Sequence, residues 1–455
     1  MERERLGSRL GFILLSAGCA IGVGNVWKFP YMAGQYGGGI FVLIYLFFLI
    51  IMGVPVMTME FSLGRASRKS PAMIYQTLTP KDKKWRVHGY TAVAGNYILM
   101  MFYTVVTGWM IRYFVDTAFG RFEGLDTSGV SQKFSELTQD TGGMIFYTWL
   151  VVILGFIICS FSLNKGLERV TKWMMIALLS IMVVLAVNSV FMKGASEGLK
   201  FYLVPNVANI RKTGLLNVVV GAMTQAFFTL SLGIGSMAIF GSYIGKDRAL
   251  MGESVNVAVL DTFVAFTSGL IIFPACSAYG VETGAGPRLI FDTLPNIFNN
   301  IPLGRLWGSL FFVFMSFAAL STILAVFENI IACCMDLFGL SRRKACLING
   351  IGLLILSMPC VLGFNILSNI TPFGSGSTIM DFEDFLVSNI ILPLGSLCYV
   401  LYCTSKRGWG WKNFTDEANL GKGLKVKSFM RIYCSYVLPI IILALFLIGI
   451  YNFFK

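Results

Sequence analysis

Residues Gly18-Cys19-Ala20-Ile21-Gly22-Val23-Gly24-Asn25 interrupt the first long apolar run of the chain, which covers residues 10–35. Such a stretch is unusual inside a membrane span, because each glycine lowers helix stability by about 1 kcal/mol relative to alanine. A second interruption, Phe228-Thr229-Leu230-Ser231-Leu232-Gly233-Ile234-Gly235, lies in the run over 217–243. One such cluster alone would indicate close helix packing through small residues. Two clusters at corresponding places in two halves of a chain instead indicate broken helices with a binding site at the bilayer midplane.

The composition places the whole chain in a membrane. Of its 455 residues, 56% are hydrophobic and 13% are charged, whereas an average soluble domain has about 25% charged residues. This excludes a cytosolic enzyme, a secreted disulfide scaffold, a disordered regulator and a nucleic-acid module. The ten cysteines lie in or at the ends of apolar runs, without the spacing of a metal site. The single histidine, His88, is expected on the surface of a basic inner loop, and no enzymatic activity is predicted.

Eleven apolar runs are long enough to cross a hydrocarbon core of about 30 Å as helices. They cover residues 10–35, 39–62, 90–119, 144–162, 168–191, 217–243, 252–279, 305–338, 343–363, 384–403 and 430–453. The runs are continuous rather than alternating, which argues against a barrel. We therefore predict an all-α integral membrane protein with one transporter domain over 1–455. Its parts would be a five-helix repeat over 1–191, a second, inverted repeat over 214–403 and an eleventh helix over 428–453.

The basic residues predict the orientation of the chain. With the N-terminus in the cytoplasm, the cytoplasmic segments carry 25 of the 36 Lys and Arg residues. This asymmetry is typical of membrane proteins. The odd number of helices then leaves the C-terminus outside the cell. The net charge of +13 is accordingly a sign of topology and not of a nucleic-acid partner.

The two helix breaks favour a particular kind of ligand. Lipid offers no partner to the N–H and C=O groups that a break sets free. Exposed N–H groups at the start of a half-helix attract an anion such as a carboxylate, and freed carbonyl oxygens suit a hard cation. An amino-acid zwitterion together with sodium fits this pairing better than a neutral sugar or a bare proton.

Several motifs resemble the neurotransmitter:sodium symporters. They are Arg9-Leu10-Gly11-Phe12-Ile13-Leu14, Gly22-Val23-Gly24-Asn25-Val26-Trp27-Lys28-Phe29-Pro30-Tyr31, Gly37-Gly38-Gly39, Gly53-Val54-Pro55, Glu60, Gly64-Arg65 and Phe227-Phe228-Thr229-Leu230-Ser231-Leu232-Gly233. The resemblance extends to about residue 450, and the eleven-helix form is similar to a bacterial branch that imports hydrophobic amino acids. It implies a bacterial leucine transporter-like fold, a 5+5 inverted repeat with helices 1 and 6 unwound, in the bacterial inner (plasma) membrane. It also implies sodium-coupled symport into the cell by alternating access, with an amino acid and the lipid bilayer as partners and no nucleic acid or obligate protein.

The resemblance further implies two sodium (Na⁺) sites. The first is matched by Ala20, Asn25, Thr229 and Asp261, and the second by Gly18, Ile21, Ala318, Ser321 and Thr322. The hydroxyls of Ser321 and Thr322 also have an interpretation without sodium, because such groups often donate hydrogen bonds to carbonyl oxygens of their own helix. Asp261 stands where the family usually has asparagine, and a carboxylate in the bilayer requires a partner. We expect it to supply the negative charge that chloride provides in other members, so that no chloride is needed.

A substrate site follows from the same resemblance. Its residues would be Ala20, Gly22, Val23, Gly24, Leu99, Tyr103, Phe228, Thr229, Ser231, Ile234, Thr322 and Val326. The N–H groups of Val23 and Gly24 and the Tyr103 hydroxyl would hold a carboxylate. Gly22 stands where amine-transporting members have aspartate, so the substrate must bring its own carboxylate. The apolar lining disfavours charged side chains and predicts a bulky aliphatic or aromatic L-amino acid, with the choice among Leu, Tyr, Trp and Met left open.

Two gates complete the expected site. Outside, Lys28 would pair with an acid among Asp381, Glu383 and Asp384, with Glu383 as the best match. Tyr103 and Phe228 would cover the substrate. Inside, Arg3 would pair with Asp336, near Ser242 and Tyr243. Glu60 is expected to tie the unwound segments together through their backbone N–H groups.

Three other classes of protein fit less well. An ion channel would repeat its polar lining around a symmetry axis, but here the polarity appears only at the breaks. A membrane-embedded enzyme would need a Ser/His, His/Glu or paired-Asp motif in the bilayer, and the sequence has none. A transporter of another amino-acid family with broken helices would be expected to lack Asn25-Val26-Trp27-Lys28-Phe29-Pro30, which is present here.

Overall fold

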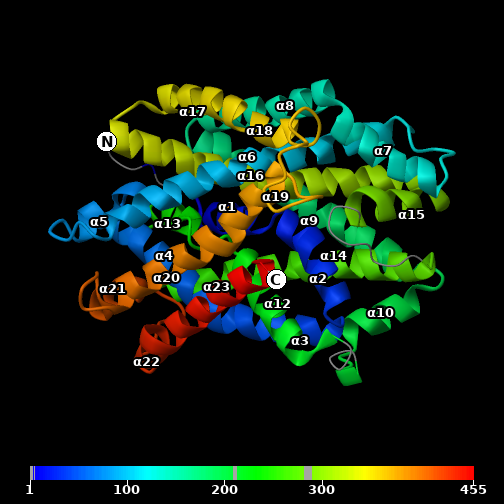
Figure 1. The fold of residues 1–455 in the computed structure, drawn as a ribbon. Coiled ribbons are helices and arrows are strands. Elements are labelled where there is room, and N and C mark those ends of the chain that lie inside the picture. The colour runs from blue at the N-terminus through cyan, green and yellow to red at the C-terminus, as the bar shows by residue number, and fades with distance from the viewer. Residues whose placement is uncertain (1–3, 5, 209–212, 281–288, 455) are drawn as a thin grey trace.

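The protein is an elongated bundle of helices in a computed structural model that describes residues 4, 6–208, 213–280 and 289–454 (Figure 1). Within these residues the only β-type pairing is an isolated bridge between Arg248 and Lys422. Nine helices in the described part are long and apolar enough to cross a membrane, and a bent pair at the N-terminus makes a tenth. The all-helical class is therefore confirmed.

The first half of the chain forms the first five expected spans. Its helices are α1 (Arg9–Ala20), α2 (Phe29–Gln35), α3 (Gly39–Phe48), α4 (Val54–Ser67), α5 (Pro71–Leu78), α6 (Arg86–Ala118), α7 (Thr127–Gln139), α8 (Thr141–Ser160), α9 (Arg169–Val190) and α10 (Ala195–Leu203). Short π-helical turns join α1 to α2, α3 to α4 and α8 to α9. The long helices among these begin and end within a few residues of the predicted runs.

The second half contains the remaining spans. Its helices are α12 (Leu215–Phe228), α13 (Ser236–Gly241), α14 (Leu250–Ala278), α15 (Leu294–Asn300), α16 (Gly304–Phe338), α17 (Arg342–Leu356), α18 (Met358–Leu362), α19 (Ile379–Phe385), α20 (Leu392–Thr404), α21 (Trp411–Ala418), α22 (Met430–Ile432) and α23 (Leu438–Phe454). Each expected run thus has a counterpart. However, the sixth is divided between α12, which is too short to count as a span, and α13. The predicted total of eleven is therefore not fully confirmed.

Both predicted breaks are present. The axis of the first span bends by 58° between Arg9–Ala20 and Gly24–Gln35. The second break lies between α12 and α13, where Ser231, Gly233 and Gly235 have φ values of +50°, +103° and +78°. Glycine adopts such left-handed conformations at low cost, which explains why this turn is glycine-rich.

The breaks are enclosed by helices that pack closely around them. Helix α1 packs against α14 and α16, α6 runs along α16, and α4 packs against α13. A Cβ atom at Gly64 on α4 would lie 1.8 Å from the Ala238 carbonyl oxygen on α13, so only glycine permits this approach. Close packing of this kind holds the polar segments of spans one and six away from lipid.

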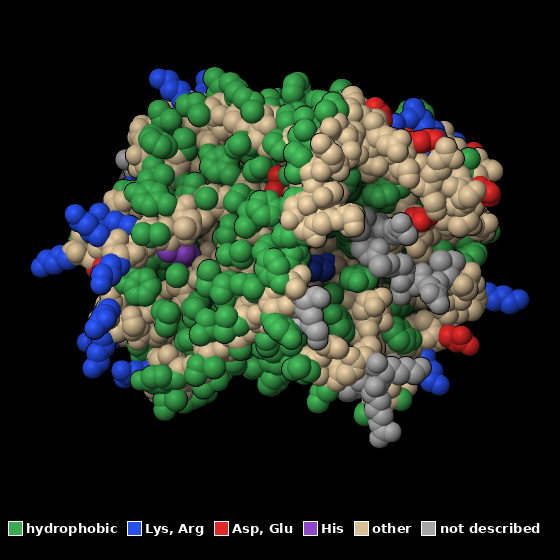
Figure 2. Space-filling view, in the orientation of Figure 1, with side chains coloured by type: hydrophobic (Ala, Val, Ile, Leu, Met, Phe, Trp, Pro, Cys, Tyr) green, Lys and Arg blue, Asp and Glu red, His purple; other side chains and the backbone are tan. Residues whose placement is uncertain are grey.

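Charged side chains are unevenly distributed over the visible surface. Figure 2 shows a broad hydrophobic band between two ends, with most visible Lys and Arg side chains at the end that carries α5 and α21. Most visible Asp and Glu side chains lie at the opposite end, near α7. We name these the inner and outer ends after the orientation that the sequence predicts.

Candidate functional site

Three buried polar side chains meet where the two breaks face α14. Asn25 Nδ2 donates to Asp261 Oδ1 at 2.7 Å and to the Thr229 hydroxyl at 3.1 Å. The Thr229 hydroxyl donates to Asp261 Oδ2 at 3.1 Å. None of the three is more than 2% exposed. Their oxygen atoms suit a hard cation, and the carboxylate provides one compensating charge.

A second polar group joins α1 to α16. The Thr322 hydroxyl lies 3.1 Å from the Ile21 carbonyl oxygen and 3.3 Å from that of Gly18. The Ser321 hydroxyl lies 2.9 Å from the Ala318 carbonyl oxygen and 3.4 Å from that of Ile21. Ser321 therefore does bond to its own helix, as the alternative interpretation expected. Both hydroxyls nevertheless also reach the carbonyls that end α1, so the structure brings the five residues together.

A small cavity of about 30 Å³ lies beside the first polar group. It is lined by Ala20, Gly22, Gly24, Leu99, Tyr103, Phe228, Thr229, Ser231, Ile234, Thr322 and Leu392. Ten of the twelve expected substrate residues are among these. Val23 instead lines a neighbouring cavity, and Val326 is fully buried outside the lining.

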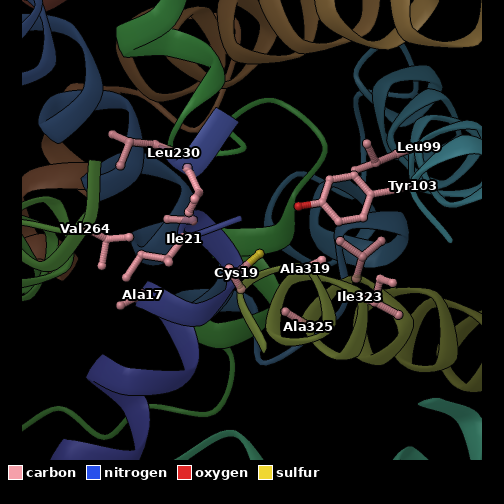
Figure 3. Packing of buried hydrophobic residues seen from close by; sticks show 14 of the residues in the cluster. Ala17, Cys19, Ile21, Leu99, Tyr103, Leu230, Val264, Ala319, Ile323 and Ala325 are labelled. Atoms are coloured by element: carbon pink, nitrogen blue, oxygen red, sulfur yellow. The ribbon is translucent and has the colours of Figure 1, made fainter. Parts of the chain in front are cut away.

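Tyr103 and Gly22 shape one wall of this central cavity. The Tyr103 ring extends from α6 with its hydroxyl directed at the first span (Figure 3). The Val23 N–H donates to this hydroxyl at 2.9 Å. A Cβ at Gly22 would lie 2.3 Å from the same oxygen and 2.7 Å from the Thr322 hydroxyl. The absence of a side chain at Gly22 therefore keeps this end of the cavity open to a ligand.

A larger cavity of about 260 Å³ lies next to the central one. Its lining residues are Val23, Gly24, Trp27, Lys28, Tyr31, Phe102, Tyr103, Val106, Phe228, Met380, Asp381 and Asp384. Tyr103 and Phe228 line both cavities, so their rings lie between the two. The aromatic lid that the sequence predicts from these two residues would lie here, and it stays a prediction.

The structure does not bring Glu383 to Lys28, and this part of the predicted outer gate is corrected. The Lys28 ammonium lies 3.7 Å from the centre of the Phe228 ring, in the cavity that Asp381 and Asp384 also line. Glu383 is 3% exposed and lies beside the Cys360 thiol, outside the lining of that cavity. Neighbouring residues on an α-helix point about 100° apart, so Asp384 faces the cavity where Glu383 does not.

The expected inner pair is only partly described. Arg3 lies outside the described residues, so its pairing stays a prediction. Asp336 Oδ2 accepts a hydrogen bond from the Ser70 backbone N–H at 2.7 Å, which joins α16 to the start of α5. Asp336 thus lies at the inner end, where the prediction places it.

Tyr243 takes part in a different inner contact. Its hydroxyl donates to Glu328 Oε1 at 2.6 Å. Glu328 is fully buried on α16 and forms an ion pair with Arg342 at the start of α17. Arg342 Nε also donates to the Cys159 carbonyl oxygen at 2.8 Å. These contacts link α16, α17, the end of α8 and Tyr243 just beyond α13.

The second break is held by side chains from two directions. Glu60 Oε1 accepts from the Gly233 N–H at 2.6 Å. This contact reaches the second break, and a tie between Glu60 and the first break stays a prediction. His88 Nε2 lies 3.3 Å from the Gly233 carbonyl oxygen, and its Nδ1 lies 2.5 Å from the Tyr75 hydroxyl. The prediction of a surface histidine is therefore wrong, because α6 begins at Arg86 and His88 is only 7% exposed.

Sequence reasoning missed several residues around the site. The Tyr45 hydroxyl lies 3.4 Å from Asp261 Oδ2, and Gln225 Nε2 donates to a carbonyl at the first break at 3.2 Å. A polar side chain inside a long apolar run was the available signal for both. The same signal applies to Asn96 and Asn329, which are described below.

Comparisons with known proteins give a consistent result. The family described as the sodium:neurotransmitter symporter family matches residues 3–122 and 128–455. The sodium-dependent transporter YhdH of Bacillus subtilis is 33% identical over 448 residues, which cover 98% of each chain. A sodium-dependent transporter of Haemophilus influenzae is 31% identical over 464 residues, which cover 99% of each chain. A crystal structure of MhsT in complex with L-phenylalanine has a TM-score of 0.87 and 35% identity, covering 98% of this chain and 100% of that one.

Proposed function

Because this chain belongs to the sodium:neurotransmitter symporter family, we propose that it imports bulky aliphatic or aromatic L-amino acids together with sodium. The chain is a multi-pass membrane protein, a sodium-dependent transporter and not an enzyme. The proposal adds the substrate class, the number of sodium ions and the independence from chloride.

One observation carries the choice of substrate. The central cavity combines an apolar lining with a carboxylate-binding end made of the Tyr103 hydroxyl and the broken first span. Gly22 leaves that end without a negative charge, so an amine with no carboxylate would lack a partner there. Leu99 and Ile234 offer no charge to a substrate side chain, and desolvating a charged one would be costly. MhsT, which is similar in sequence and fold, binds L-phenylalanine in its crystal structure, and this supports the aromatic part of the proposal.

Two sodium ions would bind as co-substrates. One would contact Asn25, Thr229 and Asp261, with Ala20 beside it on the cavity wall. The other would bind among Gly18, Ile21, Ala318, Ser321 and Thr322. The carboxylate of Asp261 would balance the first ion, so we propose that transport does not require chloride.

The proposed cycle moves the broken spans against the rest of the bundle. Spans one and six would rock together against a scaffold that includes α6 and α16. Lys28 and Asp384, above the rings of Tyr103 and Phe228, would form the outer gate. At the inner end, the Glu328–Arg342 contact and a contact between Arg3 and Asp336 would open to release the substrate.

The orientation and the repeats remain part of the proposal. The basic inner end would face the cytoplasm of a bacterial cell, with the C-terminus outside. Residues 1–191 and 214–403 would be the two inverted repeats and 428–453 the eleventh helix. With this orientation, an inward sodium gradient drives the amino acid into the cell.

Uptake into proteoliposomes tests the proposal. The purified protein is given a panel of radiolabelled amino acids under an inward gradient of sodium or potassium, in chloride or in gluconate. We expect uptake of aliphatic or aromatic amino acids with sodium only and to the same extent in both anions. Sodium-driven uptake of charged amino acids alone, or of none, in a preparation shown to be folded would overturn the substrate assignment.

A further inference from the structure

Two buried asparagines from different helices meet beneath the second break. Asn96 lies on α6 and Asn329 on α16, and they are 1% and 0% exposed. Asn96 Nδ2 donates to the Ile234 carbonyl oxygen at 2.9 Å, and Asn329 Nδ2 donates to the same oxygen at 3.3 Å. Asn329 Nδ2 also lies 3.1 Å from Asn96 Oδ1. The three groups form one hydrogen-bonded unit that joins two scaffold helices to the unwound segment.

The unwound segment needs such an anchor because its backbone is not fixed by a helix. Ile234 stands between Gly233 and Gly235, whose φ values are +103° and +78°. Glycine is permissive at these angles, so the segment could adopt other shapes. A carbonyl that a helix break sets free inside a membrane must find a partner in the protein. The two amides supply this partner and thereby select one position for Ile234.

The anchor affects the substrate site because the side chain of Ile234, whose carbonyl is held, is part of that site. This side chain is fully buried and lines the central cavity. Gly95, the neighbour of Asn96, lies behind it, and a Cβ at Gly95 would be 3.1 Å from Ile234 Cγ2 and 2.7 Å from Ile391 Cγ2. The space behind Ile234 is therefore filled, and its side chain stays in the cavity wall as long as its carbonyl is held.

We propose that Asn96 and Asn329 are positioning residues for substrate selectivity, which set the depth of the side-chain pocket by holding the Ile234 carbonyl. The identity of the substrate rests on the proposed function, whereas the clamp rests on the hydrogen bonds just described. Neither asparagine is hydrogen-bonded to Asn25, Thr229 or Asp261 in the described part of the chain, so the clamp acts on the amino-acid side chain and not on the sodium ions.

Two substitutions should move selectivity in opposite directions. Asn329→Ala removes one amide and leaves room beneath Ile234, so the pocket deepens. The ratio of kcat/KM for phenylalanine to that for valine should then rise about tenfold, the scale on which a methylene-sized change discriminates substrates. Gly95→Ala pushes Ile234 into the cavity, and the same ratio should fall. The sodium concentration for half-maximal uptake should stay unchanged in both variants.

A matched control separates this effect from general destabilisation. Asn349 on α17 is also a buried asparagine, 3% exposed, and it bonds to the Tyr97 hydroxyl and to the Ala345 carbonyl oxygen away from the cavity. Asn349→Ala should lower thermal stability without changing the phenylalanine-to-valine ratio. Equal ratios in wild type and Asn329→Ala, or shifts of the same sign in Asn329→Ala and Gly95→Ala, would overturn the proposal.

Hydrogen–deuterium exchange tests the clamp without reference to a substrate. Peptides that cover residues 229–236 should exchange faster in Asn329→Ala and in the milder Asn96→Ser than in wild type, and Asn349→Ala should match wild type. Equal exchange in all four proteins refutes the clamp. Faster exchange in the two clamp variants, combined with no sodium-driven uptake of any amino acid by wild type, refutes the proposed function instead and supports the clamp.

Discussion

Replacing Asp261 by asparagine removes the charge of the first polar group and keeps its shape. Asp261 is fully buried, and its carboxylate accepts hydrogen bonds from Asn25, Thr229 and Tyr45. An asparagine fills the same space and still offers one oxygen to these donors. The substitution therefore isolates the charge from the packing.

The expected loss of sodium affinity can be calculated from the burial of the site. Removing one partner of a buried charge pair costs about 3–5 kcal/mol, and 1.4 kcal/mol corresponds to about a factor of ten in affinity. Sodium affinity in Asp261→Asn should thus fall about 10²- to 10⁴-fold in the absence of chloride. A small anion near the site would replace the missing charge, so chloride should restore part of the affinity where the variant remains active.

Sodium titrations of amino-acid binding in chloride and in gluconate measure this effect. Wild type should give the same sodium affinity in both anions, and Asp261→Asn should bind sodium only with chloride present or not at all. Glu383→Gln is a control that removes another buried carboxylate outside the sodium group, and it should keep the wild-type sodium affinity. Unchanged chloride-free binding by Asp261→Asn would refute the role given to the carboxylate.

Three further substitutions test other parts of the site. Gly22→Asp should abolish amino-acid binding, because its Cβ would lie 2.3 Å from the Tyr103 hydroxyl and its charge would repel the substrate carboxylate. Retained affinity for amino acids would contradict the proposed orientation of the substrate in the cavity. Asp384→Asn should speed dissociation of bound amino acid and Glu383→Gln should not, since of these two acids only Asp384 lines the outer cavity. The reverse pattern in a dissociation assay would restore Glu383 as the gate. Asn25→Ala should weaken sodium-dependent binding about 10-fold or more, because it removes a hydrogen bond to a charged group worth about 1.5–3 kcal/mol; equal sodium titrations would exclude a role for this amide.

Much of the fold follows from patterns that the sequence displays openly. The long apolar runs predict the spanning helices because lipid admits few alternatives. The glycine clusters around Gly22 and Gly233 predict the two breaks, since both combine poor helix formers with polar side chains. Spacing alone, however, could not give the shape of the turn between α12 and α13, because that shape depends on the φ values at Ser231, Gly233 and Gly235.

The errors have local physical causes. Glu383 and Asp384 are adjacent acids on one helix, and only the rotation of α19 determines which of them faces Lys28. His88 has basic residues before it in the sequence, but α6 starts early enough to bury it against Tyr75. Such outcomes depend on the helix start and on the rotation about its axis, which composition does not specify.

The polar contacts of the unwound segment could be anticipated only in part. Asn96 and Asn329 stand out as amides in apolar runs, but they lie 233 residues apart in the chain. Their common partner is a backbone carbonyl, which carries no sequence signal. Long-range contacts to backbone atoms of this kind required the structure.

The accumulation limit in proteoliposomes tests the central claim of sodium-coupled symport most directly. The ratio of internal to external amino acid at steady state is measured while the sodium gradient is varied at a fixed membrane potential. With two sodium ions per substrate, a tenfold gradient and 100 mV together supply about 7.4 kcal/mol, or an accumulation of about 10⁵-fold. The logarithm of the ratio should rise with a slope of two against the logarithm of the sodium gradient. A slope of one would mean that only one sodium ion is coupled to each substrate, which would contradict the proposal of two coupled ions. A ratio that does not respond to sodium would contradict sodium-coupled symport itself.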